Sequence, residues 1–274
     1  MAAASEGTGG DSFLRRNYLP SDYVRDTVGT AVEGVVHVEA GWDAGSQLHE
    51  TAWVSGVLTG APFAWSIVAG AQLQRVGATA DLSLQRRWPS VVGIRQMLDW
   101  DPTPLRDQPP PFLGEPQWES GLANLARHDL TFDLQVSVDQ LDAAVELVRR
   151  HPDVLFILDH AGVREPLTPR VQHAWLSALS GFSGLSNVVV KVSGYAGVDP
   201  SWEPEHFRRY VLRLLDAFGP RRCIFASNFP FDKESISFSD LIALHAWAVD
   251  SLSTEEKDAY FAGTAQATYH LRKM

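Results

Sequence analysis

Short apolar runs that end abruptly in polar residues recur along the whole chain. The clearest is Cys223–Asp232 (CIFASNFPFD), in which a strand-like run gives way to polar residues, a proline and a carboxylate. Other apolar runs begin near residues 35, 66, 91, 131, 155 and 188. Strands of a parallel sheet are apolar on both faces, and in barrels their carboxyl ends carry the reaction site. The pattern predicts seven parallel strands that share one polar pocket.

Helical periodicity fills the intervals between these runs. Leu141–Arg150 places its apolar side chains on one stripe, and Phe207–Phe218 repeats them at helical spacing until Gly219 ends the pattern. Thr168 has the form of a helix N-cap, because a proline follows it. Strands that alternate with helices require parallel pairing and right-handed crossovers. The expected fold is therefore an α/β (β/α)8 TIM-like barrel.

The number of strands is one short of that barrel. No convincing strand precedes Val35; residues 1–12 are rich in alanine and glycine and typical of a flexible tail, and residues 13–30 contain only a short helical pattern. Either the barrel is incomplete or the protein begins earlier than this chain. We expect residues 13–274 to form a single barrel-like domain that lacks its first strand or contains a truncated one.

A proline- and aspartate-rich segment at residues 99–117 interrupts the alternation of strands and helices. Loops of this length are uncommon in compact domains unless they have a function or are disordered. The segment follows a predicted strand end, on the face where barrels carry their chemistry. It is either a lid that gates substrate entry or an insertion without a function.

Composition and charge narrow the class of protein. Hydrophobic residues make up 45% of the chain, charged residues 20%, and the net charge is -10, which disfavours binding to nucleic acid or to an anionic membrane. Cys223 is the only cysteine, so we expect a packed core thiol, with no disulfide framework and no cysteine-based zinc site. Without a membrane-length apolar stretch or a signal sequence, the expected location is the cytoplasm. The oligomeric state is open.

Arg95 is the candidate substrate clamp, because a guanidinium group can bind a planar carboxylate through two oxygens. A structural ion pair with Asp133 or Glu39 is the alternative. His37 and Glu39 share one strand face by two-residue alternation, and Asp133 and Gln135 share another. These four side chains either bind substrate or satisfy one another by buried hydrogen bonds and ion pairs.

His160 and Lys191 are the other candidates for chemistry. His160 follows the run Phe156–Asp159 at a predicted strand end, so it is expected to bind a metal, transfer protons or bind substrate. Its alternative role is a hydrogen bond inside the barrel mouth. Lys191 points inward with Ser193, and we expect it to pair with an interior carboxylate beside the substrate; a Schiff base is the alternative.

Six motifs in order resemble the successive strand motifs of the amidohydrolase-related family. They are His37–Ala40, Gly93–Gln96, Phe132–Gln135, Leu158–Gly162, Val190–Gly194 and Arg222–Pro230. This family of metal-dependent TIM-barrel hydrolases includes sugar-acid lactonases and pyrone-dicarboxylate hydrolases. The resemblance runs from about residue 18 to the C-terminus. It implies a barrel whose second strand contains His37.

The same resemblance reveals two departures from the family pattern. Family members usually open with a strand that ends in His-x-His and supplies two metal ligands, and this chain contains no His-x-His. Hydrolytic members usually carry an aspartate near the end of strand eight, where Asn228, a poor base, stands here. Asp232, four residues later, is the candidate replacement. Catalytic zinc needs three protein ligands, and only His160 is identified, so we expect a divalent metal to be weakly bound or absent.

The resemblance implies hydrolysis of a lactone or related cyclic ester of a small acid. Water would attack the ring carbonyl, with Arg95 on a substrate carboxylate, His160 on the metal or the water, and Asp232 as base next to Asn228. Two alternatives stay open: a degenerate, metal-free barrel that binds a ligand or partner without hydrolysis, and a metal-free lyase or isomerase. An in-frame His-x-His upstream of Met1 would favour the metallohydrolase.

Overall fold

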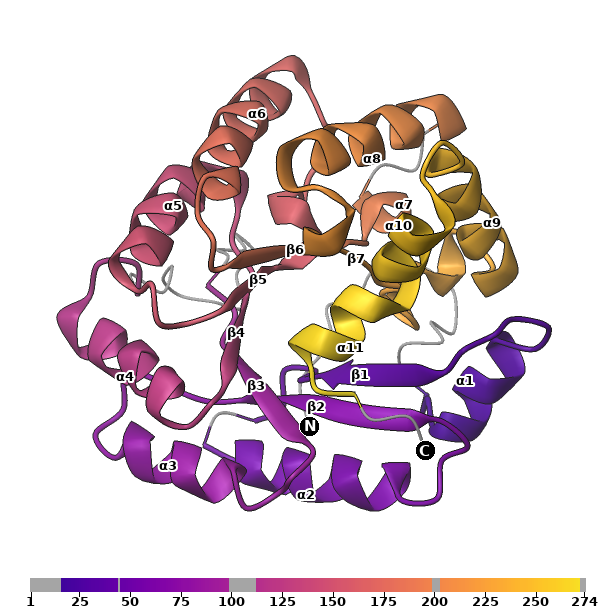
Figure 1. Cartoon of the computed structure of the whole chain (residues 1–274). Helices are drawn as coiled ribbons and strands as arrows, with labels where there is room; N and C mark the ends of the chain where they lie inside the picture. The colour runs from indigo at the N-terminus through magenta and orange to yellow at the C-terminus, as the bar shows by residue number, and fades with distance from the viewer. Residues whose placement is uncertain (1–15, 44, 99–111, 199–202, 272–274) are drawn as a thin grey trace, which may run out of the picture.

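Seven strands form one parallel sheet in which each strand pairs with the next along the chain (Figure 1). The computed structural model describes residues 16–43, 45–98, 112–198 and 203–271. Its strands are β1 (Gly34–Val38), β2 (Ala64–Gly70), β3 (Val91–Arg95), β4 (Thr131–Leu134), β5 (Phe156–Leu158), β6 (Val188–Val192) and β7 (Cys223–Phe225). All seven predicted strands are present, and the α/β barrel class is confirmed.

The helices surround the sheet on its outer side except for α11, which lies inside the ring, beside β7 and the inner core (Figure 1). They are α1 (Pro20–Asp26), α2 (Gln47–Leu58), α3 (Ala78–Gln85), α4 (Pro116–Arg127), α5 (Leu141–Arg150), α6 (Pro169–Ser183), α7 (Tyr195–Val198), α8 (Pro204–Phe218), α9 (Phe238–Ala248), α10 (Thr254–Asp258) and α11 (Thr264–Thr268). Single turns of tighter or wider helix occur at η2 (Val138–Gln140), η3 (Asp159–Gly162), η4 (Pro220–Arg222), η5 (Phe231–Glu234) and η6 (Ala259–Gly263).

The predicted limits of α5, the start of α6 and the end of α8 agree with the structure, whereas α8 begins at Pro204, before the predicted Phe207. Thr168 accepts a hydrogen bond from the Val171 amide at the start of α6, and α8 ends at Phe218 with Gly219 as its C-cap. The loop predicted for residues 99–117 ends earlier in the structure, because α4 begins at Pro116. Proline suits the first position of a helix, where its missing backbone N–H removes no helical hydrogen bond. Residues 99–111 lie outside the described residues.

Two apolar cores lie on the two sides of the sheet. The outer one, between strands and helices, contains the buried rings of Trp118, Phe132 and Trp175 and the thiol of Cys223, which is a core thiol as predicted. The inner one fills the barrel with Val68, Val92, Ile157, Val189, Ile224 and Tyr269. Tyr269 comes from the C-terminal segment after α11, so this segment forms part of the barrel interior.

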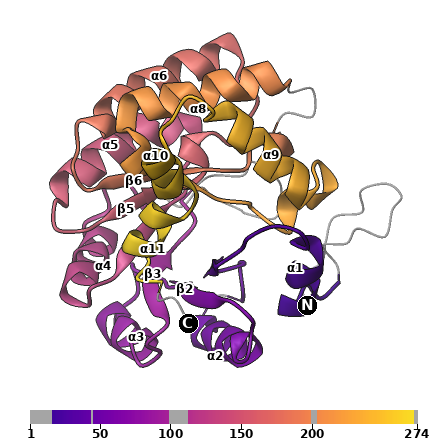
Figure 2. The ribbon, with the colours of Figure 1, turned by 45° about the vertical axis from the view of Figure 1, so that its right-hand side comes forward.

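The barrel is open between β1 and β7, which do not pair in the described part of the chain. All five residues of β1 are half-buried, whereas β4, β5 and β6 are buried along their whole length. Figure 2 shows the open side, with α1 and α9 at its borders. Over the residues that the structure describes, the sheet is therefore a curled, seven-stranded TIM-like barrel with unpaired edges at β1 and β7.

Candidate functional site

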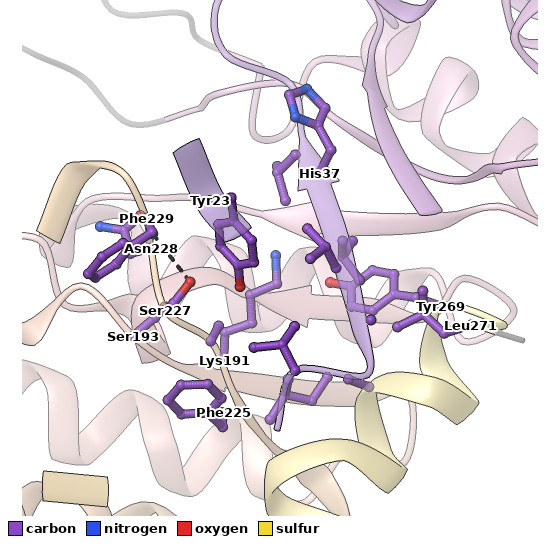
Figure 3. A pocket seen from close by; sticks show the side chains of 18 of the residues that line it. Tyr23, His37, Lys191, Ser193, Phe225, Ser227, Asn228, Phe229, Tyr269 and Leu271 are labelled. Carbon is purple, nitrogen blue, oxygen red and sulfur yellow. Dashed lines mark hydrogen bonds between the residues drawn. The ribbon is translucent and has the colours of Figure 1, made fainter. Parts of the chain in front are cut away.

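A cleft of about 2260 Å³ runs along the open side of the barrel and over the carboxyl ends of its strands. Its lining includes the predicted site residues His37, Glu39, Arg95, Gln135, His160, Lys191, Asn228 and Asp232. Asp133 completes the predicted set, because it forms an ion pair with Lys191. In Figure 3 the ends of Lys191 and Tyr269 point toward the middle of this pocket. The predicted residues thus gather at one mouth.

Arg95, at the end of β3, is held by several acceptors. Its Nε donates to Glu39 Oε1 at 2.7 Å, and its Nη1 donates to Gln135 Oε1 at 3.0 Å and Asp159 Oδ2 at 3.2 Å. Its Nη2 donates to the Glu39 carbonyl at 2.5 Å. Burial would lower the pKa of Arg95, but the carboxylates of Asp159 and Glu39 outweigh burial and raise it. The guanidinium is charged, and its bonds to the described residues use four of its five N–H groups.

Lys191 joins two buried carboxylates in the barrel interior. Its ammonium forms ion pairs with Asp133 and with Asp159, whose Oδ1 lies 2.8 Å away. Burial would lower the pKa of Lys191, yet the two carboxylates raise it. A Schiff base requires the neutral amine, so this environment disfavours that alternative. Pairing with an interior carboxylate, the role expected for Lys191, is what the structure contains.

Asp133 also accepts hydrogen bonds from a residue far along the chain. The Tyr269 hydroxyl lies 3.1 and 3.0 Å from its two carboxylate oxygens. Burial raises the pKa of Asp133 to about 6, against the opposing effect of Lys191. Burial would also raise the pKa of Asp159, but Lys191 and Arg95 outweigh it and lower that pKa. The two carboxylates therefore differ in acidity although they share one lysine.

His160 lies on a strained turn directly after β5. Its backbone φ is 53°, and Ala161 follows with 50°, a left-handed conformation that residues with side chains rarely adopt. The turn is held by the Tyr210 hydroxyl, 3.0 Å from the His160 carbonyl, and by the Trp175 indole, 2.9 Å from the Ala161 carbonyl. The imidazole Nδ1 lies 2.9 Å from Ser193 Oγ. Burial lowers the pKa of His160 to about 4, so its ring is neutral at neutral pH.

Asp232, on η5, lies beside Asn228. Asn228 Nδ2 donates to Asp232 Oδ1 at 2.7 Å, and the Gly194 amide donates to the same carboxylate. Burial raises the pKa of Asp232 to about 6, and these two hydrogen bonds oppose the rise. Asn228 itself has a left-handed φ of 52°, which asparagine tolerates better than most residues. A carboxylate with its pKa near neutrality therefore lies in the cleft.

His37 and Glu39 have separate surroundings. Glu39 accepts from Arg95 and from the Gly41 amide. His37 instead faces Glu50 on α2, with 3.9 Å between His37 Nε2 and Glu50 Oε1. The buried His37 Nε2 and Glu50 Oε2 have no hydrogen-bond partner among the described residues. His37 on β1 and Glu39, directly after β1, thus take part in different contacts.

Four contributors to the site were missed by the sequence reasoning: Ser193, Asp159, Glu50 and Tyr269. Asp159 adjoins His160 in a strand-end motif, so its position was a usable signal. Ser193 was used only to orient Lys191. Glu50 lies on a helix and Tyr269 in the C-terminal segment, and neither position carries a local pattern that points to the barrel mouth.

The described residues do not fit a metal ion. No three His, Cys, Asp or Glu side chains in that part of the chain are placed to share one. The carboxylates of Glu39 and Asp159 are already paired with Arg95 and Lys191, and His160 uses Nδ1 toward Ser193. Catalytic zinc needs three protein ligands, a set that the described side chains do not supply as they are placed.

Comparisons with known proteins point to one family. The family model described as amidohydrolase matches residues 13–271. An uncharacterized protein, y4mH, of Sinorhizobium fredii is 30% identical over 94% of this chain and 87% of its own length. An L-fucono-1,5-lactonase of Burkholderia ambifaria is 28% identical over 81% of this chain and 76% of its own.

A solved structure extends the likeness to the fold. It is the crystal structure of an amidohydrolase from Burkholderia multivorans with bound zinc, which is 26% identical, covers 94% of this chain and 90% of its own, and superposes with a TM-score of 0.79. Among the described helices of the present chain, none has the length and apolar character needed to cross a membrane.

Proposed function

We propose that this chain, which belongs to the amidohydrolase family, hydrolyses a lactone or related cyclic ester of a small acid. The observation that carries the proposal is that His160 and Asp232 both contact the turn at Ser193 and Gly194 beside the cleft. Two groups that can move protons therefore border one pocket, in a chain with lactonase relatives.

In the proposed reaction, a water molecule attacks the ring carbonyl. With Nδ1 of His160 held by Ser193, Nε2 is the nitrogen available to accept a proton from that water. The carbonyl oxygen becomes an oxyanion, which the remaining N–H of Arg95 can stabilise. The ring C–O bond then breaks, and the departing oxygen takes a proton from the imidazolium or from Asp232.

The ion pairs of Arg95 and Lys191 disfavour the binding of a substrate carboxylate to these two cations. Arg95 and Lys191 are offset by the three carboxylates of Glu39, Asp133 and Asp159. A substrate carboxylate would have to displace Glu39 or Asp159 from Arg95, and so leave a buried charge without its partner. This cost disfavours the carboxylate clamp that Arg95 alone suggests.

The test is a direct assay of acid release from L-fucono-1,5-lactone and from 2-pyrone-4,6-dicarboxylate, each compared with its uncatalysed rate. We expect activity on the uncharged lactone and a loss of about 10²- to 10⁴-fold in kcat for His160→Gln. His173→Gln, on the exposed side of α6, is the matched control and should keep full activity. Equal activity of His160→Gln and the intact chain would refute the role of His160.

The runner-up is a barrel that binds such a ligand without hydrolysing it. Asn228, shortly after the end of β7, favours it, because an amide cannot serve as base. Calorimetric binding of the lactone without any acid release would support this second function. Release of acid above the uncatalysed rate would eliminate it.

A further inference from the structure

Gly194, shortly after β6, lies against the imidazole of His160. A Cβ atom built on Gly194 would stand 2.6 Å from His160 Nδ1, 3.0 Å from Cγ and 3.2 Å from Cε1. Real Cβ atoms essentially never approach another heavy atom closer than 3.0 Å, so any side chain at this position would displace the ring. The ring has little freedom to yield, because its backbone is strained and its Nδ1 is bonded to Ser193.

The same residue also contacts Asp232. The backbone amide of Gly194 donates a hydrogen bond to the Asp232 carboxylate, and Asn228 donates to it from the other strand end. Gly194 has a φ of +73°, which glycine adopts without strain. This left-handed turn connects β6 to α7 and lies in contact with both the His160 imidazole and the Asp232 carboxylate.

We propose that Gly194 is a positioning residue for the reaction: its missing side chain leaves the space that the His160 imidazole occupies, and its amide holds Asp232. The turn after β6 thereby sets the places of both proton-transfer groups at once. The catalytic role of Gly194 rests on the proposed hydrolysis. The contacts of Gly194 with His160 and Asp232 do not depend on it.

Gly194→Ala, compared with Gly219→Ala, tests the proposal. Gly219 has the same φ of +73°, and a Cβ there meets nothing within 4 Å, so both variants carry the backbone strain and only one meets the imidazole. We expect Gly194→Ala to lower kcat by about 100-fold with a much smaller change in KM, the scale of misplacing a catalytic group by about 1 Å. Gly219→Ala should lose thermal stability while keeping its kcat.

A readout that is independent of activity is the proton–nitrogen NMR correlation of the His160 ring, assigned by its loss in His160→Gln. The resonances should move in Gly194→Ala and stay in place in Gly219→Ala. If Gly194→Ala does not fold, Ser193→Ala removes the Nδ1 contact without adding an atom and should move the same resonances. In the His160→Gln background, adding Gly194→Ala should lower kcat by much less than it does in the intact chain.

The outcomes separate this inference from the proposed function. Unchanged His160 resonances in folded Gly194→Ala, or equal losses of kcat in the two glycine variants, would overturn the positioning role. If the intact chain hydrolyses no lactone but the resonances move as expected, the proposed function fails and the steric control of His160 by Gly194 stands.

Discussion

The side chains of individual residues at the barrel mouth are held in place mainly by ion pairs. Alternation along the predicted strands places Arg95, Asp133 and Glu39 on faces that can meet, and they do gather in the structure. Which carboxylate pairs with which cation depends on distances across the barrel. Asp133 pairs with Lys191, and Asp159 joins Arg95 instead. Sequence pattern therefore predicts the members of such a network better than its pairing.

Replacing Arg95 by methionine should destabilise the fold. The change leaves Glu39 and Asp159 without their guanidinium partner in a buried place, which costs about 3–5 kcal/mol. Urea unfolding measures the difference. Arg170→Met, which removes an exposed pair with Asp139, is the control and should lose less than about 1 kcal/mol. A small loss for Arg95→Met, with a large loss of affinity for an acidic lactone, would instead favour the clamp.

Asp232 should make stability depend on pH. Its pKa rises from 3.8 to about 6 on folding, so the folded state holds its proton more tightly than the unfolded state. The resulting stabilisation is fully present below a pH of about 4 and is lost as the pH rises through about 6. Over that range the intact chain should lose about 3 kcal/mol relative to Asp232→Asn, measured by urea unfolding at each pH. A difference that is constant with pH would contradict the shifted pKa.

At the level of elements, the C-terminal segment is the part that local pattern describes least. Periodicity and caps located the strands, both limits of α5, the start of α6 and the end of α8, because those signals are local. The place of Tyr269 depends on a contact across 136 residues, with a buried aspartate on β4. No spacing along the chain predicts that Tyr269 pairs with Asp133, so this contact becomes visible only in the folded barrel.

Tyr269→Phe tests how much this segment stabilises the interior. The change removes the hydroxyl that serves Asp133, and a buried acceptor left with fewer donors costs about 1–3 kcal/mol. Tyr18→Phe is the control, since its hydroxyl bonds Asp26 in a half-buried position near α1 and should matter less. Thermal and urea unfolding report both changes. Equal, small losses would show that the hydroxyl contributes little.

For the whole molecule, the open side of the barrel leaves β1 and β7 with free edges in the described part of the chain. An exposed strand edge is a template for pairing with another chain, and a charge on the edge suppresses such pairing. We expect the protein to self-associate as its concentration rises, measured by sedimentation velocity over a range of concentrations. A sedimentation coefficient that does not change with concentration would contradict this expectation.

The contact between Tyr269 and Asp133 also bears on the order in which the protein is made. Each strand pairs with the one synthesised just before it, so the sheet can grow strand by strand as the chain leaves the ribosome. The barrel interior cannot form in this order, because the Tyr269 hydroxyl can bond Asp133 on β4 only after residue 269 has left the ribosome. A nascent chain can thus assemble its sheet early, while this buried part of the barrel interior forms only after Tyr269 has been synthesised.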